Sequence, residues 1–303
     1  MNKYDIIIIG GGPAGLTAGI YAGRQGTKAL ILEKEQIGGL GRQIANMENY
    51  PGFEEISGLE LINKMKKQIK NTEIKEYEYV ENIEKINEDQ YNFKVDTIKE
   101  SYLTKTIILA TGTVHKQLNV KGEEEFKGKG VSYCATCDGF FFQNKEIIVA
   151  GGGNTAVQEA LFLENLGCKV TIIHKRNKLQ ADDYLKDKIK EKGIKVLFKS
   201  EIEEIKGEQI VSSVIIKTKN SREELPVSGV FISEDYKPHN ELAKKLNIEL
   251  DETNHIITDK NQKTNIEFIY AAGDICGGLK QWVVACSEGA IASTTAYNDI
   301  EHN

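Results

Sequence analysis

The chain has 303 residues, of which 40% are hydrophobic and 28% are charged, and only 4 are proline. This composition is typical of a soluble globular chain with two domains of ordinary size, and it excludes collagen-like, low-complexity and disordered classes. Lys and Arg number 39 against 45 Asp and Glu, which gives a net charge of −6. Such an excess of acid disfavours nucleic acid or anionic lipid as the main partner.

No stretch of the sequence has the pattern of a membrane span or a signal peptide. Residues 6–23 carry no charge, but the glycines at 10–12 and Pro13 break any helix that could cross a bilayer there. Asp5 interrupts the start of the apolar stretch that a signal peptide needs. Five cysteines are an odd number and too sparse for a secreted disulfide framework. We therefore expect a cytoplasmic protein.

The chain begins with a β-α-β unit, whose strand, helix and second strand are predicted over residues 4–9, 16–25 and 28–32. The loop after the first strand carries Gly10, Gly12 and Gly15 in the spacing G-x-G-x-x-G. These glycines permit a tight turn, close approach of a pyrophosphate, and close packing of helix on strand. The helix N-terminus offers free N–H groups to the phosphates, and Glu33 is placed to accept from a ribose hydroxyl. The unit therefore predicts a dinucleotide site rather than a structural turn.

The same pattern recurs 141 residues later. A strand, the run Gly-Gly-Gly-Asn-Thr-Ala, a helix and a strand are predicted over residues 145–150, 151–156, 157–166 and 169–173. The position of Glu33 is taken by His174, which Lys175 and Arg176 follow. An acid favours a free ribose 2′-hydroxyl, whereas cations favour a 2′-phosphate. The two units therefore predict a flavin on the first and NADPH on the second.

The rest of the chain is predicted as mixed α and β, without a long linker or a block of charge. Helices are predicted over residues 58–69 and 281–296. Strands are predicted near residues 107–109 and over 210–217 and 227–233.

A Cys-x-x-Cys pair, Cys134 and Cys137, precedes the second unit and is followed by Asp138. A zinc site would need a second ligand pair, and the sequence has no other Cys-x-x-Cys and no close His pair, so no metal site is predicted. A purely structural disulfide is disfavoured in a cytosolic chain. A redox dithiol fits best beside two dinucleotide units, with both sulfurs within reach of each other and Asp138 placed to shuttle a proton.

Six segments together resemble the bacterial low-molecular-weight thioredoxin reductases: residues 10–15, 48–53, 110–112, 134–139, 151–156 and 273–274. The resemblance runs from the first strand to the last helix, and Cys-Ala-Thr-Cys-Asp-Gly is highly specific to that family. It implies an α/β fold with two Rossmann-like, three-layer ββα dinucleotide-binding domains, the second inserted into the first. The implied domains are an FAD-binding domain of residues 1–116 and 246–303, and a pyridine-nucleotide-binding domain of residues 117–245 that carries the dithiol. The resemblance also implies a homodimer.

The resemblance assigns cofactor residues as well. For FAD they are Gly10, Gly12, Pro13, Ala14, Gly15, Glu33, Gly38, Gly39, Asn49, Ala110, Thr111, Gly112, Gly273, Asp274, Lys280 and Gln281. For NADPH they are Gly151, Gly153, Asn154, Thr155, Ala156, His174, Lys175, Arg176 and Gln180. In the family, the residue at Asp274 bonds the ribityl chain, and the helix that starts near Gln281 directs its N-terminus at the flavin pyrimidine ring.

The implied mechanism carries electrons from NADPH to FAD by hydride transfer, and from the flavin to the Cys134–Cys137 disulfide. Cys137 is then the flavin-facing sulfur that forms a charge-transfer thiolate. Cys134 is the interchange thiol that attacks the disulfide of thioredoxin or a thioredoxin-like protein, and Asp138 is the acid/base. The family rotates one domain against the other between half-reactions, and here the hinges are expected near residues 116–117 and 244–245.

Three positions depart from the family pattern. The family has the motif His-Arg-Arg-x-x-x-Arg, but this chain has Lys175 in place of its first arginine and Gln180 in place of its last. A lysine cannot make a planar bidentate contact. The family's Gly-His-x-Pro is replaced by a segment with Glu234 and Asp235, which would repel a nucleotide phosphate that they face. Leu40 stands where the family has a glutamine that contacts FAD. The first two departures weaken the predicted nicotinamide site.

These departures leave alternatives open. One is a ferredoxin-dependent flavin thioredoxin reductase with a degenerate nucleotide site, although such relatives also lose the glycine motif, which is intact here at residues 151–156. A second is a relaxed nucleotide preference that includes NADH. A third is a non-catalytic flavin redox sensor that uses the dithiol as a switch, against which the intact Cys-Ala-Thr-Cys-Asp argues. Flavin ferredoxin–NADP reductases lack the dithiol and are excluded.

Overall fold

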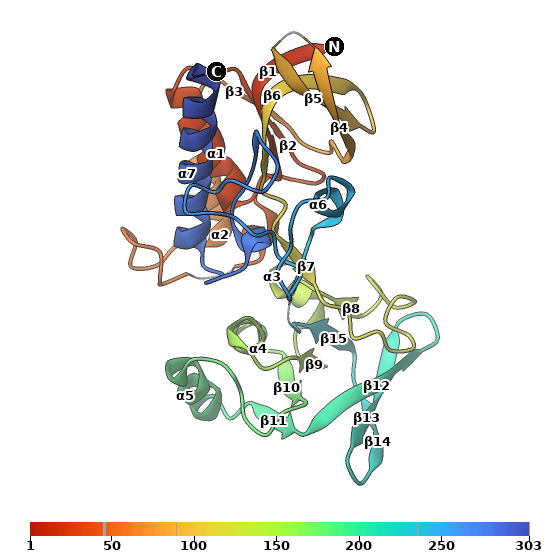
Figure 1. Ribbon diagram of the computed structural model, residues 1–303. Helices are drawn as coiled ribbons and strands as arrows, with labels where there is room; N and C mark the ends of the chain where they lie inside the picture. The colour runs from red at the N-terminus through yellow and green to blue at the C-terminus, as the bar shows by residue number, and fades with distance from the viewer. Residues whose placement is uncertain (45–46, 89, 235, 303) are drawn as a thin grey trace. The chain divides into compact units, whose positions relative to one another are not determined.

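The computed structural model describes residues 1–44, 47–88, 90–234 and 236–302. It divides into two compact units, of which the first is built from Met1–Val114 and Pro238–Asn303 and the second from His115–Lys237. Each unit contains a sheet of parallel strands together with helices (Figure 1), as an α/β fold requires. No helix in the described part of the chain is long and apolar enough to cross a membrane.

The first unit has a sheet with the strand order β3-β2-β1-β6-β5-β4, and β17 also pairs with β6. Its strands are β1 (Asn2–Ile9), β2 (Ala29–Leu32), β3 (Thr72–Lys75), β4 (Val80–Glu88), β5 (Tyr91–Thr97), β6 (Ser101–Leu109) and β17 (Ile269–Ala271). β1 is parallel to β2 and β6, whereas β4, β5 and β6 form an antiparallel meander. Its helices and 3-10 turns are α1 (Pro13–Arg24), η1 (Gly39–Gln43), α2 (Gly58–Gln68), α6 (Glu241–Lys245), η3 (Asp274–Cys276) and α7 (Trp282–Glu301).

Local sequence explains why β1 and α1 form where they do. Residues 6–9 are apolar throughout because β1 is covered on both faces, and its side chains alternate between the hydrophobic clusters on the two sides of the sheet. α1 begins at Pro13, whose fixed φ suits the first helical turn. α7 lies beside α1 (Figure 1), and a Cβ on Gly289 of α7 would overlap the Ala14 carbonyl. This close packing brings the last helix to the loop after β1.

The second unit repeats the arrangement with the strand order β11-β10-β9-β15-β8. These strands are β8 (Val131–Ser132), β9 (Glu146–Ala150), β10 (Lys169–His174), β11 (Lys195–Phe198) and β15 (Gly229–Ile232). A separate antiparallel sheet consists of β12 (Ser200–Gly207), β13 (Val211–Thr218) and β14 (Arg222–Pro226). The helical elements are α3 (Ala135–Asp138), η2 (Gly139–Phe142), α4 (Asn154–Asn165) and α5 (Asp183–Glu191).

The chain passes between the units in two short strands, β7 (Thr113–His115) and β16 (Tyr236–Pro238), which pair with each other. The domain boundaries expected from the sequence, after residues 116 and 245, lie farther along the chain. The difference at the second boundary arises because α6 packs with the first unit. Ala243 of α6 is buried in the same cluster as Ile83 of β4, and Lys245 Nζ donates a hydrogen bond of 2.7 Å to the Glu81 carbonyl.

Candidate functional site

The predicted FAD residues gather at one edge of the first unit's sheet. The parallel strands β1, β2, β6 and β17 all end there, because Ile9 lies opposite Leu32 and Leu109, and Ala271 lies opposite Leu109. The segments after these strand ends carry the predicted residues Gly10, Glu33, Ala110 and Gly273. Between β1 and β6 the strand order reverses, which is where open α/β sheets bind ligands.

The loop after β1 is shaped to receive a pyrophosphate. Gly10 has a φ of +105°, and a Cβ there would overlap the Ala110 carbonyl, so only glycine fits. A Cβ on Gly15 would overlap the Gly10 carbonyl, whereas the same position on Gly12 faces open space. Gly12 caps α1 without a side-chain hydrogen bond, so the N–H groups of the first turn are left for a phosphate.

Glu33 is buried at the end of β2 and faces the same loop. Its Oε2 accepts a hydrogen bond of 2.7 Å from the Gly11 N–H, and its Oε1 accepts one of 3.0 Å from the Glu35 N–H. Each carboxylate oxygen has a second lone pair, so Glu33 can still accept from a ribose hydroxyl.

Two neighbouring loops carry further predicted FAD residues. The Gly38 N–H donates a hydrogen bond of 2.8 Å to the Gly11 carbonyl. The Thr111 hydroxyl donates one of 2.8 Å to the His239 carbonyl. The remaining predicted residues of these two loops are Gly39, Ala110 and Gly112.

The predicted ribityl contact comes from the segment after β17. Gly273 has a φ of +85°, and a Cβ there would be 2.9 Å from the Cβ of Ala14 at the start of α1. Asp274 follows it. Burial raises the pKa of Asp274, and the nearby charges of Lys280 and His255 oppose this shift.

Two predicted residues meet at the start of α7. Asn49 Nδ2 donates a hydrogen bond of 2.9 Å to Gln281 Oε1. Gln281 caps α7 without a side-chain hydrogen bond to the helix. Sequence reasoning missed Glu288 of α7, whose Oε2 accepts a hydrogen bond of 2.7 Å from the Gly273 N–H and whose pKa is raised by burial and by the Asp274 carboxylate. The available signal was that Glu288 is the only charged residue between positions 282 and 297.

Cys134 and Cys137 form a disulfide at the start of α3, with their Cα atoms 5.3 Å apart. Cys134 is buried and Cys137 is exposed. Cys134 is the N-cap residue of α3, and its Sγ accepts a hydrogen bond of 3.2 Å from the Cys137 N–H. A backbone N–H directed at a sulfur stabilises the thiolate that forms when a disulfide is cleaved. The turn can therefore hold a thiolate at Cys134.

Asp138 is held beside this turn by Ser132, a residue that sequence reasoning missed. The Ser132 hydroxyl donates a hydrogen bond of 2.6 Å to Asp138 Oδ2 and accepts one of 3.1 Å from the Cys134 N–H. The predicted acid/base thus belongs to one hydrogen-bonded network with the dithiol backbone.

The second glycine loop has the shape of the first. Gly151 has a φ of +147°, and a Cβ there would overlap the Ser233 carbonyl, whereas Gly153 faces open space. Gly153 caps α4 without a side-chain hydrogen bond. Asn154, the first residue of α4, exchanges two hydrogen bonds of 3.0 and 2.8 Å with Asp182. The remaining predicted residues of the loop, at the start of α4, are Thr155 and Ala156.

The side chains beyond β10 offer less positive charge than the sequence predicts. Lys175 Nζ forms an ion pair of 2.9 Å with Glu234 Oε2. Gln180 Nε2 donates a hydrogen bond of 2.7 Å to a carbonyl of its own loop, and Arg176 is exposed. Asp235, the second acid expected near the nucleotide, lies outside the described residues.

His174, at the position that Glu33 takes in the first unit, is buried. A Cβ on Gly152 would overlap its ring, so the imidazole lies against the glycine loop. Burial lowers the pKa of His174, and the Glu234 carboxylate opposes the shift. Burial therefore disfavours the charged imidazole that would attract a 2′-phosphate.

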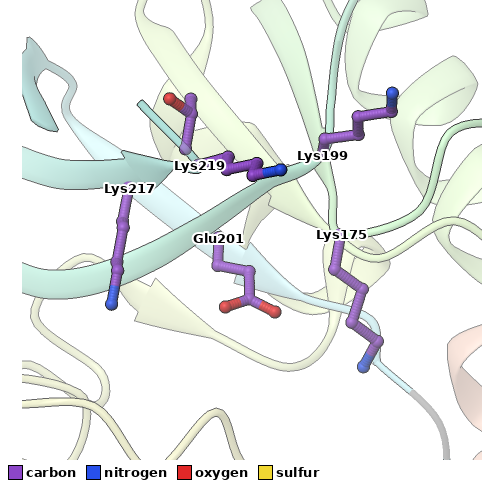
Figure 2. Close-up of a pocket in the computed structure, with 6 residues that line it drawn as sticks. Lys175, Lys199, Glu201, Lys217 and Lys219 are labelled. Carbon is purple, nitrogen blue, oxygen red and sulfur yellow. The ribbon is translucent and has the colours of Figure 1, made fainter. Parts of the chain in front are cut away.

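A pocket of about 230 Å³ opens beside Lys175 (Figure 2). Its lining is mostly cationic and consists of Lys175, Lys199, Glu201, Lys217, Thr218 and Lys219. Lys199 follows β11 as Lys175 follows β10, and His174 lies opposite Phe198, so the two lysines come from adjacent strand ends. That adjacency of two parallel strands is the signal that could have found Lys199. Four lysines against one glutamate favour an anion in this pocket.

Comparisons with known proteins extend over the whole chain. Residues 4–289 match the family model described as pyridine nucleotide-disulphide oxidoreductase. A thioredoxin reductase from Peptoclostridium acidaminophilum is 40% identical, over 100% of this chain and 98% of that protein. A protein of Clostridium pasteurianum, described as a 34.2 kDa protein in the rubredoxin operon, is 38% identical over 97% of this chain and 96% of its own length. The crystal structure of a thioredoxin reductase from Lactococcus lactis has a TM-score of 0.92 and 40% identity, covering 99% of this chain and 100% of that one.

These likenesses confirm the predicted α/β fold with two Rossmann-like domains. They also confirm the family that the Cys-Ala-Thr-Cys-Asp-Gly segment indicates. The reaction type is that of an oxidoreductase acting on a disulfide. The chain belongs to the pyridine nucleotide-disulphide oxidoreductases and, within them, to the bacterial low-molecular-weight thioredoxin reductases.

Proposed function

We propose that the protein takes electrons from NADPH, passes them through FAD and uses them to reduce the disulfide of thioredoxin. The observation that carries the proposal is the Cys134–Cys137 disulfide, which lies in the same unit as the second glycine loop. Family membership supports FAD and NADPH as the cofactors and thioredoxin, or a thioredoxin-like protein, as the substrate.

The first unit would hold FAD. Gly12 and the first turn of α1 would receive the pyrophosphate, because a cradle without side chains and with unused N–H groups lies there. Glu33 would accept from the adenosine ribose, and Asp274 would bond the ribityl chain. Gln281 and the start of α7 would lie at the pyrimidine ring. Bound there, FAD supplies a two-electron carrier between a hydride donor and a disulfide.

Within the second unit, the dithiol would carry the electron pair onward. Cys137 is the exposed sulfur that an electron donor can reach, and two-electron cleavage of the S–S bond releases Cys134 as a thiolate stabilised by the Cys137 N–H at 3.2 Å. Cys134 then attacks one sulfur of the thioredoxin disulfide and forms a mixed disulfide. Cys137 attacks that bond, which releases reduced thioredoxin and restores the Cys134–Cys137 disulfide. Asp138 would give the proton to the leaving thiolate.

NADPH is the electron donor that we propose. The glycine loop, Arg176 and the lysine pocket beside Lys175 support it, whereas the Glu234 ion pair weakens it. Anaerobic titration of the purified yellow protein with NADPH, NADH and reduced ferredoxin, followed by flavin absorbance, tests the choice. Reduction by NADPH bears it out. Failure of both nucleotides at millimolar concentration, together with rapid reduction by ferredoxin, would overturn it and leave the thioredoxin half of the reaction standing.

A ferredoxin-dependent reductase is the second candidate, and the Lys175–Glu234 ion pair is the observation that favours it. The pair removes one of the two cations left in the motif, and Gln180 is bonded within its own loop. The relative from Clostridium pasteurianum is described by its place in a rubredoxin operon. The titration above separates the two candidates.

We infer that the protein works as a homodimer in the cytoplasm. Cys168, Cys276 and Cys286 are free, which suits a reducing compartment. Light scattering on the purified protein measures the assembly, and a mass equal to the 33.8 kDa chain would contradict the dimer. Catalytic turnover of thioredoxin in the same preparation would exclude a non-catalytic redox sensor.

A further inference from the structure

The second unit contains a buried acid that its likeness to the first unit does not explain. Glu159 lies in α4, and its side chain is only 7% exposed. The offset of 141 residues that aligns the two glycine loops places Glu159 at Ala18 of α1, which is fully buried in a hydrophobic cluster. Packing of this helix on the sheet is therefore satisfied by a small apolar residue. A buried carboxyl costs free energy unless it is hydrogen-bonded, so Glu159 needs another explanation.

Groups on two different elements act on the Glu159 carboxyl. The hydroxyl of Ser233, directly after β15, donates a hydrogen bond to Glu159 Oε2. Ala135, the first residue of α3, packs in one hydrophobic cluster with Ala156 and Ala160 of α4, and its backbone N–H lowers the pKa of the same carboxyl. Ser233 stands where the first unit has Ala110. A Cβ on Gly10 would overlap the carbonyl of Ala110, and a Cβ on Gly151 would overlap the carbonyl of Ser233. An acid and a hydroxyl thus stand where the first unit has two alanines.

The first unit carries no such dithiol in its described residues, because its two cysteines, Cys276 and Cys286, are both free. Ala135 lies between the two cysteines of the disulfide, so the N–H that Glu159 binds belongs to the dithiol turn itself. The Glu–Ser pair therefore occurs only in the unit where a dithiol has to be held.

We propose that Glu159 is a positioning residue for the dithiol, which ties the Cys134–Cys137 turn through Ala135 and Ser233 to the end of β15. This positioning role deepens the proposed function. It rests on that function in one respect, that the dithiol is the redox group. The Ser233 carbonyl lies against Gly151, where a Cβ would overlap it, so Ser233 contacts both Glu159 and the second glycine loop. The place of the two sulfurs is thereby coupled to the place of the nucleotide loop.

The charge of Glu159 adds a second effect. Burial raises the pKa of Glu159 to about 8, and the Ala135 N–H opposes the shift. The dithiol turn next to α4 carries Cys134, Cys137 and Asp138, and Glu234 follows Ser233. The other elements packed against α4 carry His174 at the end of β10, Lys169 and Glu146 at the starts of β10 and β9, and the lysines and acids of α5. Among the described residues, none of these charges contributes to the shift in the pKa of Glu159. Ionisation above pH 8 would place a negative charge behind the turn, which disfavours a thiolate there.

The test measures two properties of the purified holoenzyme that need neither NADPH nor thioredoxin. One is the equilibrium between dithiol and disulfide in a dithiothreitol redox buffer at pH 7. The other is the rate at which iodoacetamide alkylates the Cys134 thiolate of the reduced enzyme, freed of dithiothreitol, between pH 6 and pH 10, read by mass spectrometry of its peptide. Glu159→Gln removes the charge and keeps both contacts, because the amide oxygen accepts from the Ala135 N–H and the amide NH₂ donates to the Ser233 hydroxyl, which turns round to accept. Glu159→Ala combined with Ser233→Ala copies the first unit.

Glu164→Gln is the matched control, because Glu164 lies on the same helix and pairs with Lys192 at the surface. We expect it to match the wild type in both measurements. The double alanine variant should fold, since the first unit packs two alanines there. It should lower the equilibrium constant for disulfide formation about tenfold, because the unpaired Ala135 N–H no longer holds the turn.

Glu159→Gln should keep that constant within about twofold, because both hydrogen bonds remain. Its alkylation rate should rise with pH through a single ionisation, whereas the wild type shows a second one near pH 8. The proposal is overturned if all Glu159 variants that fold match Glu164→Gln in both measurements; if the double variant does not fold, the pH profile of Glu159→Gln decides. If the variants change the dithiol equilibrium or the alkylation profile, but the enzyme reduces no thioredoxin with any donor, the proposed function is wrong and the positioning role remains.

Discussion

The two dinucleotide units share a backbone and differ in the side chains that meet it. α1 and α4 both have 12 residues, and they begin and end 141 positions apart. Their caps Gly12 and Gly153 have φ and ψ of −73° and −173° and of −87° and −177°. At the end of the next strand, Glu33 accepts from an N–H of its glycine loop, whereas the ring of His174 lies against its own. The glycine spacing thus builds a phosphate cradle in both units, and the strand-end residue decides what else that unit can bind.

The third position of the motif shows a second difference. A Cβ on Gly15 would overlap the Gly10 carbonyl, so α1 approaches its loop as closely as a glycine allows. Ala156 takes this position in the second unit, where its Cβ lies 2.9 Å from the place that a Cβ on Gly151 would take. Gly12 and Gly153 both face open space, so the cradle tolerates the change.

The largest expected effect concerns the dithiol, which has no counterpart in the first unit. Cys134→Ser should abolish thioredoxin reduction and leave the flavin reducible, because only the exchange step loses its nucleophile. Cys137→Ser should also abolish turnover and should remove any long-wavelength thiolate–flavin absorbance. Steady-state turnover and anaerobic flavin spectra check both, with Cys168→Ala as a control at a free cysteine of the same unit. Near-normal turnover in the two serine variants would show that the electron route is wrong.

Matched substitutions in the two glycine loops should separate the units. A Cβ on Gly10 or Gly151 would overlap a backbone carbonyl at a positive φ, so each substitution distorts one cradle. Gly10→Ala should yield protein with little bound flavin. Gly151→Ala should keep its flavin and lose reduction by NADPH. The flavin-to-protein absorbance ratio and an NADPH titration measure the two effects, and loss of flavin from both variants would contradict the division of labour.

A smaller effect is expected at Glu33. Glu33→Ala removes the acceptor for the ribose and leaves the Gly11 N–H without its partner. The Kd for FAD should rise about tenfold, the value of one hydrogen bond to a charged group. Flavin content after gel filtration and back-titration with FAD measure the change. Glu35→Ala is the control, because it keeps the N–H that Glu33 binds; wild-type protein that holds no flavin and gains none on addition of FAD would defeat the assignment.

The effect on nucleotide preference is expected to be selective. Gln180→Arg should tighten NADPH binding roughly tenfold or more, because one charge-assisted bond to the 2′-phosphate is restored. NADH lacks that phosphate and should bind almost unchanged. The ratio of KM values for the two nucleotides is the measurement. The ferredoxin candidate expects neither nucleotide to reduce the flavin and the substitution to rescue little.

Local patterns were sufficient for the elements and sites whose residues lie close together in the chain. The turns at Gly10 and Gly151 follow from a positive φ that only glycine adopts readily, and the disulfide follows from a separation of three residues. Apolar runs marked the central strands of both sheets. The strand predicted over residues 210–217 is β13. The β4–β5 hairpin, β12 and β14 were not predicted, because their strands mix half-buried and exposed residues and give a weak periodic signal.

The sequence by itself determined the two cradles, the dithiol and thus the class of chemistry. Only the tertiary structure decided which side chains meet at those sites. Glu234 cancels the charge of Lys175 because the sheet order β10-β9-β15 brings their strand ends together. Ser233 reaches Glu159 because α4 packs on β9 and β10 of the same sheet. Backbone cradles depend on neighbouring φ and ψ values, which a short segment specifies. Charge and hydrogen bonding depend on distance in space, which no short segment specifies.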